Sequence, residues 1–235
     1  MGYNAPESWV AVYRGWRRLG CFAQPPAAAQ PVELQLASTR RHGMRLIGIA
    51  GLASLAAALV YGQQFKLGGK VSEFELTDTA GQPAKFSQLK GDVTAIFFIA
   101  TRCPISNDYN ERMKALYNDY SRRGVSFIFI NSNSTEPAAE VAEHAKKWGF
   151  PFKVYKDNNN VVADRFNAQF TPEVFLLDRE GVVRYHGAID DSRPVEKVTK
   201  HYLRNALEEL LAGKPISTAE TRAFGCTIKR AKKAS

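Results

Sequence analysis

Cysteine is scarce in this 235-residue sequence, which has only Cys21, Cys103 and Cys226. No two of them stand three residues apart, so the Cys-x-x-Cys pair of dithiol redox sites and of many zinc sites is missing. The four histidines, His42, His144, His186 and His201, are scattered without metal-ligand spacing. A glycine-rich phosphate loop is missing too. We therefore expect no metal and no cofactor.

The sequence also lacks an excess of positive charge in its central part, residues 44–213. Its net charge is +9, but residues 1–43 contribute +3 and residues 214–235 contribute +5, while residues 44–213 hold 21 basic and 20 acidic side chains. The excess charge thus lies at the two ends of the chain. Because a nucleic-acid interface needs a basic face on the folded body, we do not expect nucleic acid as a partner.

One long run, residues 46–65, has no charge at all, and it follows the basic stretch "TRRHGMR". A basic segment, about fifteen apolar residues and small residues after them are typical of a secretory signal. We interpret residues 44–64 as a signal peptide or an uncleaved membrane anchor, and residues 1–43 as a disordered leader or a misassigned start. The protein would then be periplasmic or otherwise exported, where disulfides persist, and cleavage would remove Cys21.

The periodicity of the remaining chain predicts an α/β fold. Continuous apolar runs indicate buried strands, and apolar residues at spacings of three and four indicate helices. The predicted elements are hairpins over 72–92 and 173–189, strands over 93–100, 125–130 and 152–156, and helices over 105–124, 137–149, 161–168 and 194–212.

Three stretches together resemble the thioredoxin superfamily. They are the opening hairpin "FELTDTAGQPAKFSQLKGD", the strand-to-helix junction "TRCP" and the turn "FTPEVFLLD". The resemblance is strongest to the redoxin branch, which includes alkyl hydroperoxide reductase/thiol-specific antioxidant, TlpA-like and peroxiredoxin-like proteins. It implies a thioredoxin-like domain over residues 68–213, with a central mixed sheet flanked by helices and an N-terminal β-hairpin extension. Residues 214–235 would then form a basic C-terminal tail that carries Cys226.

Cys103 stands where a buried strand passes into a helix. The free N–H groups of a helix start stabilise a thiolate, so we expect the pKa of this thiol to lie below its ordinary value of about 8.5. Arg102 offers a neighbouring cation, and Pro104 suits the first helical turn. The alternative is a buried, inert cysteine, since cysteine is often buried.

Ser106 occupies the position of the second cysteine in the dithiol enzymes that the sequence resembles. In peroxiredoxins, which the sequence also resembles, the cysteine that attacks peroxide falls at this second position, and a threonine lies three residues earlier. In this sequence the second position holds Ser106, and the position three residues earlier holds Cys103 instead of threonine. Thr101 lies two residues before Cys103, which is not the spacing of the peroxiredoxin threonine. The register therefore argues against a standard peroxidase.

Thr171-Pro172 matches the superfamily's cis-proline turn. An X–Pro bond is the only plausible cis peptide here, although an ordinary trans proline at a strand start is the alternative. The carboxyl ends of two predicted parallel strands bring Cys103 and the loop 131–134 to the same edge of the sheet. Asn131 and Asn133 can hydrogen-bond there, but a solvated loop is our preferred interpretation.

We interpret the protein as an exported thiol-dependent oxidoreductase. The Cys103 thiolate would attack a disulfide or a peroxide, and Cys226 or an external thiol would resolve the product. We hypothesise that Cys103 and Cys226 form a disulfide, either a stable structural one or a reversible one. Its partners would be protein thiols, disulfides or peroxide, together with a thiol reductant. The residues that would dock the substrate or support the site are Thr101, Arg102, Pro104, Ser106, Thr171 and Pro172. Pro172 would shape the backbone edge that receives the substrate. The alternatives are a peroxiredoxin-like antioxidant peroxidase and a non-catalytic thioredoxin-fold binding module.

Overall fold

The computed structural model describes residues 64–232. The predicted leader over 1–43 and, apart from its last residue, the predicted signal or anchor over 44–64 lie outside these residues. Between residues 64 and 232, no helix has the length and apolar character needed to cross a membrane.

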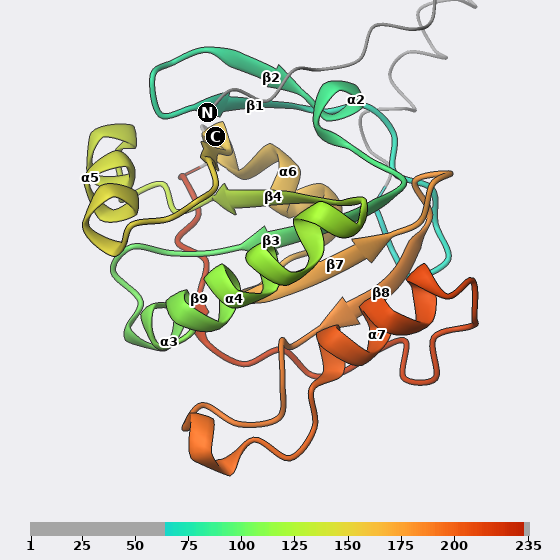
Figure 1. The fold of residues 1–235 in the computed structure, drawn as a ribbon. Coiled ribbons are helices and arrows are strands. Elements are labelled where there is room, and N and C mark those ends of the chain that lie inside the picture. Colours follow the sequence, from blue (N-terminus) through green and yellow to red (C-terminus); the bar gives the residue numbers. More distant parts are fainter. Residues whose placement is uncertain (1–63, 233–235) are drawn as a thin grey trace, which may run out of the picture. The chain divides into compact units, whose positions relative to one another are not determined.

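The described chain alternates strands and helices around one large sheet (Figure 1). The α-helices are α2 (Phe86–Leu89), α3 (Pro104–Asp108), α4 (Asn110–Tyr120), α5 (Ala138–Trp148), α6 (Val161–Phe166) and α7 (Tyr202–Leu211). Single 3₁₀ turns are η1 (Ser121–Arg123), η2 (Asn158–Asn160) and η3 (Val195–Lys197). The strands are β1 (Glu75–Asp78), β2 (Pro83–Lys85), β3 (Val93–Phe98), β4 (Val125–Asn131), β5 (Val154–Lys156), β6 (Phe170–Thr171), β7 (Glu173–Leu177), β8 (Val183–Gly187) and β9 (Cys226–Thr227).

The large sheet is mixed, in the order β2-β1-β5-β4-β3-β7-β8. Strands β3, β4 and β5 are parallel, whereas β7 and β8 continue the sheet antiparallel on one side and β1 and β2 do so on the other. Every residue of β3 is buried, as expected for a central strand covered on both faces. The predicted α/β, thioredoxin-like fold with an N-terminal hairpin extension is confirmed.

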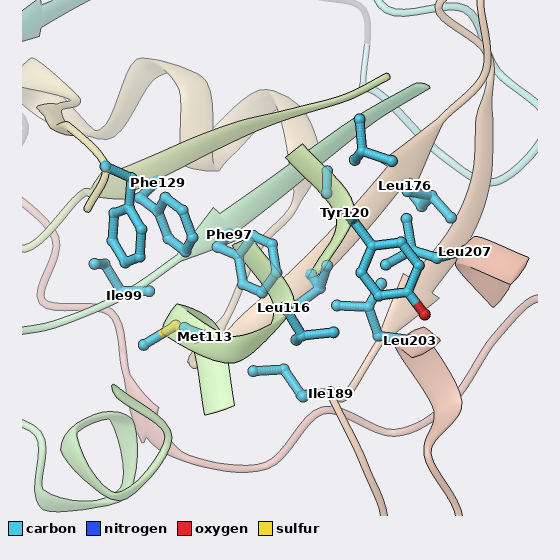
Figure 2. Close-up of a cluster of buried hydrophobic side chains, with 14 of the residues drawn as sticks. Phe97, Ile99, Met113, Leu116, Tyr120, Phe129, Leu176, Ile189, Leu203 and Leu207 are labelled. Atoms are coloured by element: carbon cyan, nitrogen blue, oxygen red, sulfur yellow. The ribbon is translucent and has the colours of Figure 1, made fainter. Parts of the chain in front are cut away.

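Two apolar cores hold the layers together, one on each face of the sheet. On one face, Phe97 and Phe129 lie among side chains from α4 and α7 (Figure 2). On the other face, Phe98 and Ile130 pack with Phe166 of α6. Alternate residues of β3 therefore face opposite cores, since successive strand side chains point to opposite sides.

Two predicted helices differ from the structure. The helix over 105–124 is divided at Tyr109 (φ −93°, ψ −4°), the residue that ends α3 and precedes α4. The helix over 194–212 begins only at Tyr202. Asp191 explains the second difference, because its carboxylate accepts the backbone N–H groups of Thr199 and Lys200 at 2.9 and 3.0 Å and holds them outside a helix. Hydrogen bonds from Thr199 and Lys200 lower the pKa of Asp191 to about 2.

The C-terminal segment does not hang free of the domain. Ile228 is 7% exposed and belongs to the core beneath α6, and β9 pairs antiparallel with β6. Ile228 therefore anchors the basic C-terminal tail on the domain. The segment returns to the sheet edge at which β3 ends.

Candidate redox site

Cys103 caps the start of α3. Its backbone is extended (φ −87°, ψ 114°), and its sulfur accepts a hydrogen bond from the N–H of Ser106 at 3.2 Å. Pro104 is the first helical residue. An N–H at this position would have no acceptor within the helix, so the lack of one in proline costs no hydrogen bond. Only 4% of Cys103 is exposed. The predicted strand-to-helix position of this cysteine is confirmed.

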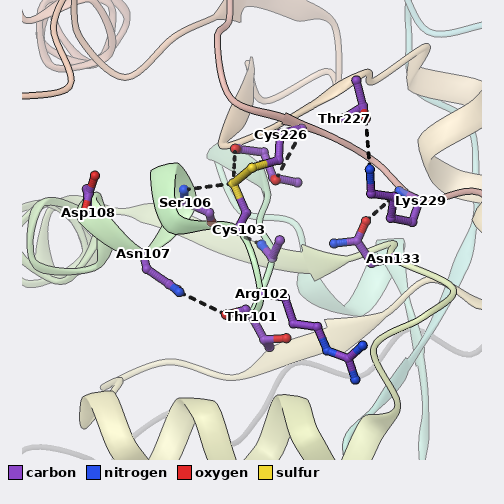
Figure 3. Close-up of a disulfide and its surroundings, with 12 residues drawn as sticks. Thr101, Arg102, Cys103, Ser106, Asn107, Asp108, Asn133, Cys226, Thr227 and Lys229 are labelled. Atoms are coloured by element: carbon purple, nitrogen blue, oxygen red, sulfur yellow. Dashed lines mark hydrogen bonds between the residues drawn. A yellow bond between two sulfur atoms is a disulfide. The ribbon is translucent and has the colours of Figure 1, made fainter.

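Cys103 is joined by a disulfide to Cys226, 123 positions along the chain (Figure 3). Their Cα atoms are 5.9 Å apart, within the ordinary range for a disulfide. The hypothesis that these two cysteines form a bond is confirmed. The sequence predicted the two partners, but only the fold shows how β9 delivers Cys226 to the edge of the sheet.

The Thr171-Pro172 peptide bond is cis, as the resemblance implied. The carbonyl oxygen of Thr171 lies 3.4 Å from the Cys103 sulfur. On β6, Thr171 stands opposite Cys226 in the antiparallel register. The backbone edge beside Pro172, which we expected to receive a substrate, is thus paired with the protein's own strand β9.

Thr101 and Arg102 do not face the sulfur atoms. The guanidinium group of Arg102 forms an ion pair with Glu140, and the Thr101 hydroxyl donates to the same carboxylate at 2.8 Å. Figure 3 shows Arg102 pointing away from the disulfide. The expectation that Arg102 places a cation beside the Cys103 thiolate is therefore not met, because Glu140 on α5 binds its side chain.

Ser106 is fully buried. Its hydroxyl accepts the N–H of Ala100 at 3.1 Å, while its own N–H donates to Cys103. The residue that replaces the second cysteine thus connects the end of β3 to the first turn of α3. It satisfies a backbone donor that would otherwise be buried without a partner.

The turn before Cys103 is held by a buried carboxylate that sequence reasoning missed. Glu136 is 3% exposed and accepts the N–H groups of Thr101 and Arg102 at 2.9 and 3.1 Å. Burial acts to raise the pKa of Glu136, but hydrogen bonds from the Thr101 N–H, the Asn131 amide and the Arg102 N–H outweigh it and leave the pKa below its ordinary value. Glu136 therefore stays ionised and positions the turn.

Asn131 and Asn133 do not lie in a solvated loop, so that interpretation is wrong. Both are buried. The ammonium group of Lys156, at the end of β5, donates to the Asn131 side chain at 2.6 Å and to the carbonyl of Asn133 at 3.0 Å. Burial lowers the pKa of Lys156. The position of Asn131 and Lys156 at the ends of predicted parallel strands could have indicated that both lie near the site. Nothing in the local sequence indicated the same for Glu136.

Among residues 64–232, no group of three or more His, Cys, Asp or Glu side chains could hold a metal ion. The chemistry available at this edge is that of the Cys103–Cys226 pair, which can be opened and closed by thiol–disulfide exchange.

A thioredoxin-like sheet, a cysteine that caps a helix and a cis-proline opposite it define the class of thioredoxin-fold redox proteins. Residues 67–186 match the AhpC/TSA family, and this match includes Cys103 and cis-Pro172 but ends before Cys226. The chain therefore belongs to the AhpC/TSA family.

Known proteins similar to this chain agree with the fold and the class. The thiol-disulfide oxidoreductase ResA of Geobacillus kaustophilus is 28% identical over 118 residues, which cover 50% of this chain and 67% of ResA. A crystal structure of an uncharacterized conserved protein from Geobacillus kaustophilus is 34% identical, with a TM-score of 0.67, and the match covers 73% of this chain and 95% of that one. A hypothetical protein from Sinorhizobium meliloti 1021 is 32% identical, with a TM-score of 0.66 and coverage of 72% and 97%.

Proposed function

We propose that this protein is a thiol-disulfide oxidoreductase that works through the Cys103–Cys226 pair. The observation that carries the proposal is the bond between a helix-capping cysteine and a distant cysteine, at the sheet edge beside cis-Pro172. The similarity to thiol-disulfide oxidoreductases supports the same activity. The substrates are thiols or disulfides, and a thiol reductant restores the reduced form.

In the reductive direction the Cys103 thiolate attacks a sulfur of the target disulfide. One target thiolate leaves, and a mixed disulfide forms on Cys103. The Cys226 thiolate then attacks the Cys103 sulfur, releases the second target thiolate and forms the Cys103–Cys226 bond. The target gains two electrons and the protein pair loses two. The Ser106 N–H, 3.2 Å from the Cys103 sulfur, stabilises the thiolate form.

The domain over residues 68–213 and the tail over 214–235 act together in this proposal, because the tail supplies the second cysteine. We also propose that the protein is exported, with residues 44–64 as signal or anchor. The charge-free run at residues 46–65 and a disulfide-bonded site support a location where disulfides persist.

The test is turnover of a disulfide substrate driven by a small dithiol. Cys103→Ser and Cys226→Ser should both reduce the rate to the background of the dithiol alone. Cys21→Ser, made in the full-length chain that keeps residues 1–64, is the matched control, since it changes the third cysteine and should keep the wild-type rate. Full activity in Cys103→Ser would reject the proposal.

Peroxide is tested with the same set of variants, as the alternative oxidant for an AhpC/TSA family member. Dithiol-dependent peroxide consumption that is lost in Cys103→Ser would reassign the protein as a peroxidase. Absence of any turnover with either substrate, together with unreactive thiols, would instead favour a non-catalytic binding module.

A further inference from the structure

Lys156, the last residue of β5, is a buried cation that the redox mechanism leaves unused. Only 8% of it is exposed. Its ammonium group donates to the Asn131 side chain at 2.6 Å, to the Asn133 carbonyl at 3.0 Å and to the Glu136 carbonyl at 2.7 Å. An ammonium group has three N–H donors, so all of them are used inside the protein. Lys156 therefore joins the end of β4 to the loop that follows this strand.

One of these contacts leads toward Cys103. The amide group of Asn131 donates to the Glu136 carboxylate at 2.5 Å, and this carboxylate holds the two backbone N–H groups that precede Cys103. Because an ammonium group only donates and a carboxylate only accepts, the two partners fix which way the Asn131 amide points. Lys156 thus orients Asn131, which in turn orients the carboxylate that holds the Cys103 turn.

A second contact leads toward Cys226. Asn133, whose carbonyl Lys156 holds, accepts the N–H of Lys229 on its side-chain oxygen at 2.7 Å (Figure 3). The N–H of the next residue, Ser134, donates to the carbonyl of Lys229 at 2.8 Å. Lys229 lies three residues after Cys226. The loop after β4 therefore holds the segment that carries Cys226, and Lys156 fixes the conformation of that loop.

The two segments that carry the cysteines thus share one anchor, the Lys156 ammonium group. We infer that Lys156 is a positioning residue of the redox reaction, which holds the Cys103 turn and the Cys226 segment in the register in which their sulfur atoms can bond. This inference rests on the proposed function. In the dithiol form the same contacts keep the two thiols together, so closing the bond orders less of the chain. Lys156 therefore shifts the equilibrium toward the disulfide.

The equilibrium with glutathione measures this shift. Glutathione disulfide oxidises the protein dithiol: the Cys103–Cys226 bond forms, the glutathione disulfide bond breaks, and two electrons and two protons pass to the two glutathione thiols that are released. The fraction of disulfide-bonded protein at a series of glutathione ratios gives the equilibrium constant. We expect Lys156→Met to lower this constant by about tenfold, because the cysteine segments are then less pre-organised for the bond.

Two further variants accompany Lys156→Met. Lys153→Met is the matched control, because it removes a positive charge from an exposed position three residues away, and it should keep the wild-type equilibrium constant. Asn133→Ala removes the acceptor of the Lys229 N–H but leaves the backbone carbonyl that Lys156 holds. It should lower the constant in the same direction as Lys156→Met, and it decides the question if Lys156→Met does not fold.

A wild-type equilibrium constant in folded Lys156→Met or in folded Asn133→Ala would overturn the inference, even if the free energy of unfolding falls. A purely structural role lowers the stability of both redox forms alike and leaves the equilibrium between them unchanged. An equal shift in Lys153→Met would assign the effect to net charge and would overturn the inference as well. The proposed function fails separately, if the wild-type protein shows no turnover of a disulfide substrate.

Discussion

A β-carbon added to Gly225 would lie 2.1 Å from the carbonyl oxygen of Thr171, the residue that precedes cis-Pro172. Real β-carbons do not approach backbone oxygens so closely, so any side chain here forces the two segments apart. The residue before the redox cysteine is therefore glycine because β9 passes directly against β6.

The first prediction concerns this contact. Gly225→Ala should displace β9 from Thr171 and weaken the Cys103–Cys226 pairing, since both depend on the same register. Titration of free thiols after refolding in a glutathione redox buffer should show a larger reduced fraction than in the wild type. Thr227→Ala, on the exposed side of the same strand, should match the wild type. A wild-type reduced fraction in Gly225→Ala would show that the two strands can separate without loss of pairing.

The second prediction concerns the stability that the disulfide supplies. The bond spans 123 positions, and the chain-entropy description assigns a loop of this length about 4–5 kcal/mol of stabilisation. Because the anchored tail already orders part of this loop, we expect a loss of about 2–4 kcal/mol in Cys226→Ser. Denaturant unfolding under non-reducing conditions measures it. Cys21→Ser is the control, and wild-type protein in reductant should unfold like Cys226→Ser.

The third prediction concerns Ser106, which stands in place of a second cysteine. Ser106→Ala leaves the N–H of Ala100 buried without its acceptor, and a buried unsatisfied donor costs about 1–3 kcal/mol. We expect a loss of unfolding free energy in that range. Ser87→Ala, an exposed serine of α2, should change it by less than about 0.5 kcal/mol. Equal stabilities of the two variants would remove the structural role assigned to Ser106.

The fourth prediction is a pH dependence that arises from Glu136. Its pKa is lower in the folded protein than its ordinary value of 4.5, so the folded state binds the proton less readily than the unfolded chain. The stabilisation is therefore fully present above about pH 4.5 and is lost as the pH falls through the folded pKa. Glu136→Gln should be less stable near neutral pH and should lose less stability on acidification than the wild type.

Denaturant unfolding at a series of pH values tests this prediction. Glu143→Gln is the matched control, since Glu143 lies exposed on α5. A parallel acid dependence in Glu136→Gln and the wild type would show that Glu136 does not carry the effect. Faster proteolysis around Thr101 and Arg102 in Glu136→Gln would locate the loss at the turn before Cys103.

The sequence by itself determined the framework of the site. The apolar run ending in β3 and Pro104 in the first helical turn placed Cys103 at a helix start. The resemblance of "FTPEVFLLD" to the superfamily's turn implied the cis Thr171-Pro172 bond. The helix start could be predicted because burial patterns and the first helical turn depend on a few neighbouring residues, whereas the cis bond was predicted from the resemblance.

Only the tertiary structure decided what surrounds Cys103. The fold brought Cys226 to it from 123 positions away, paired β9 with β6, directed Arg102 toward Glu140 and buried Glu136 behind the Cys103 turn. None of these contacts leaves a trace in local periodicity, because each one joins residues that are adjacent in space and distant along the chain. Their free energies depend on burial and register, which exist only once the sheet has formed.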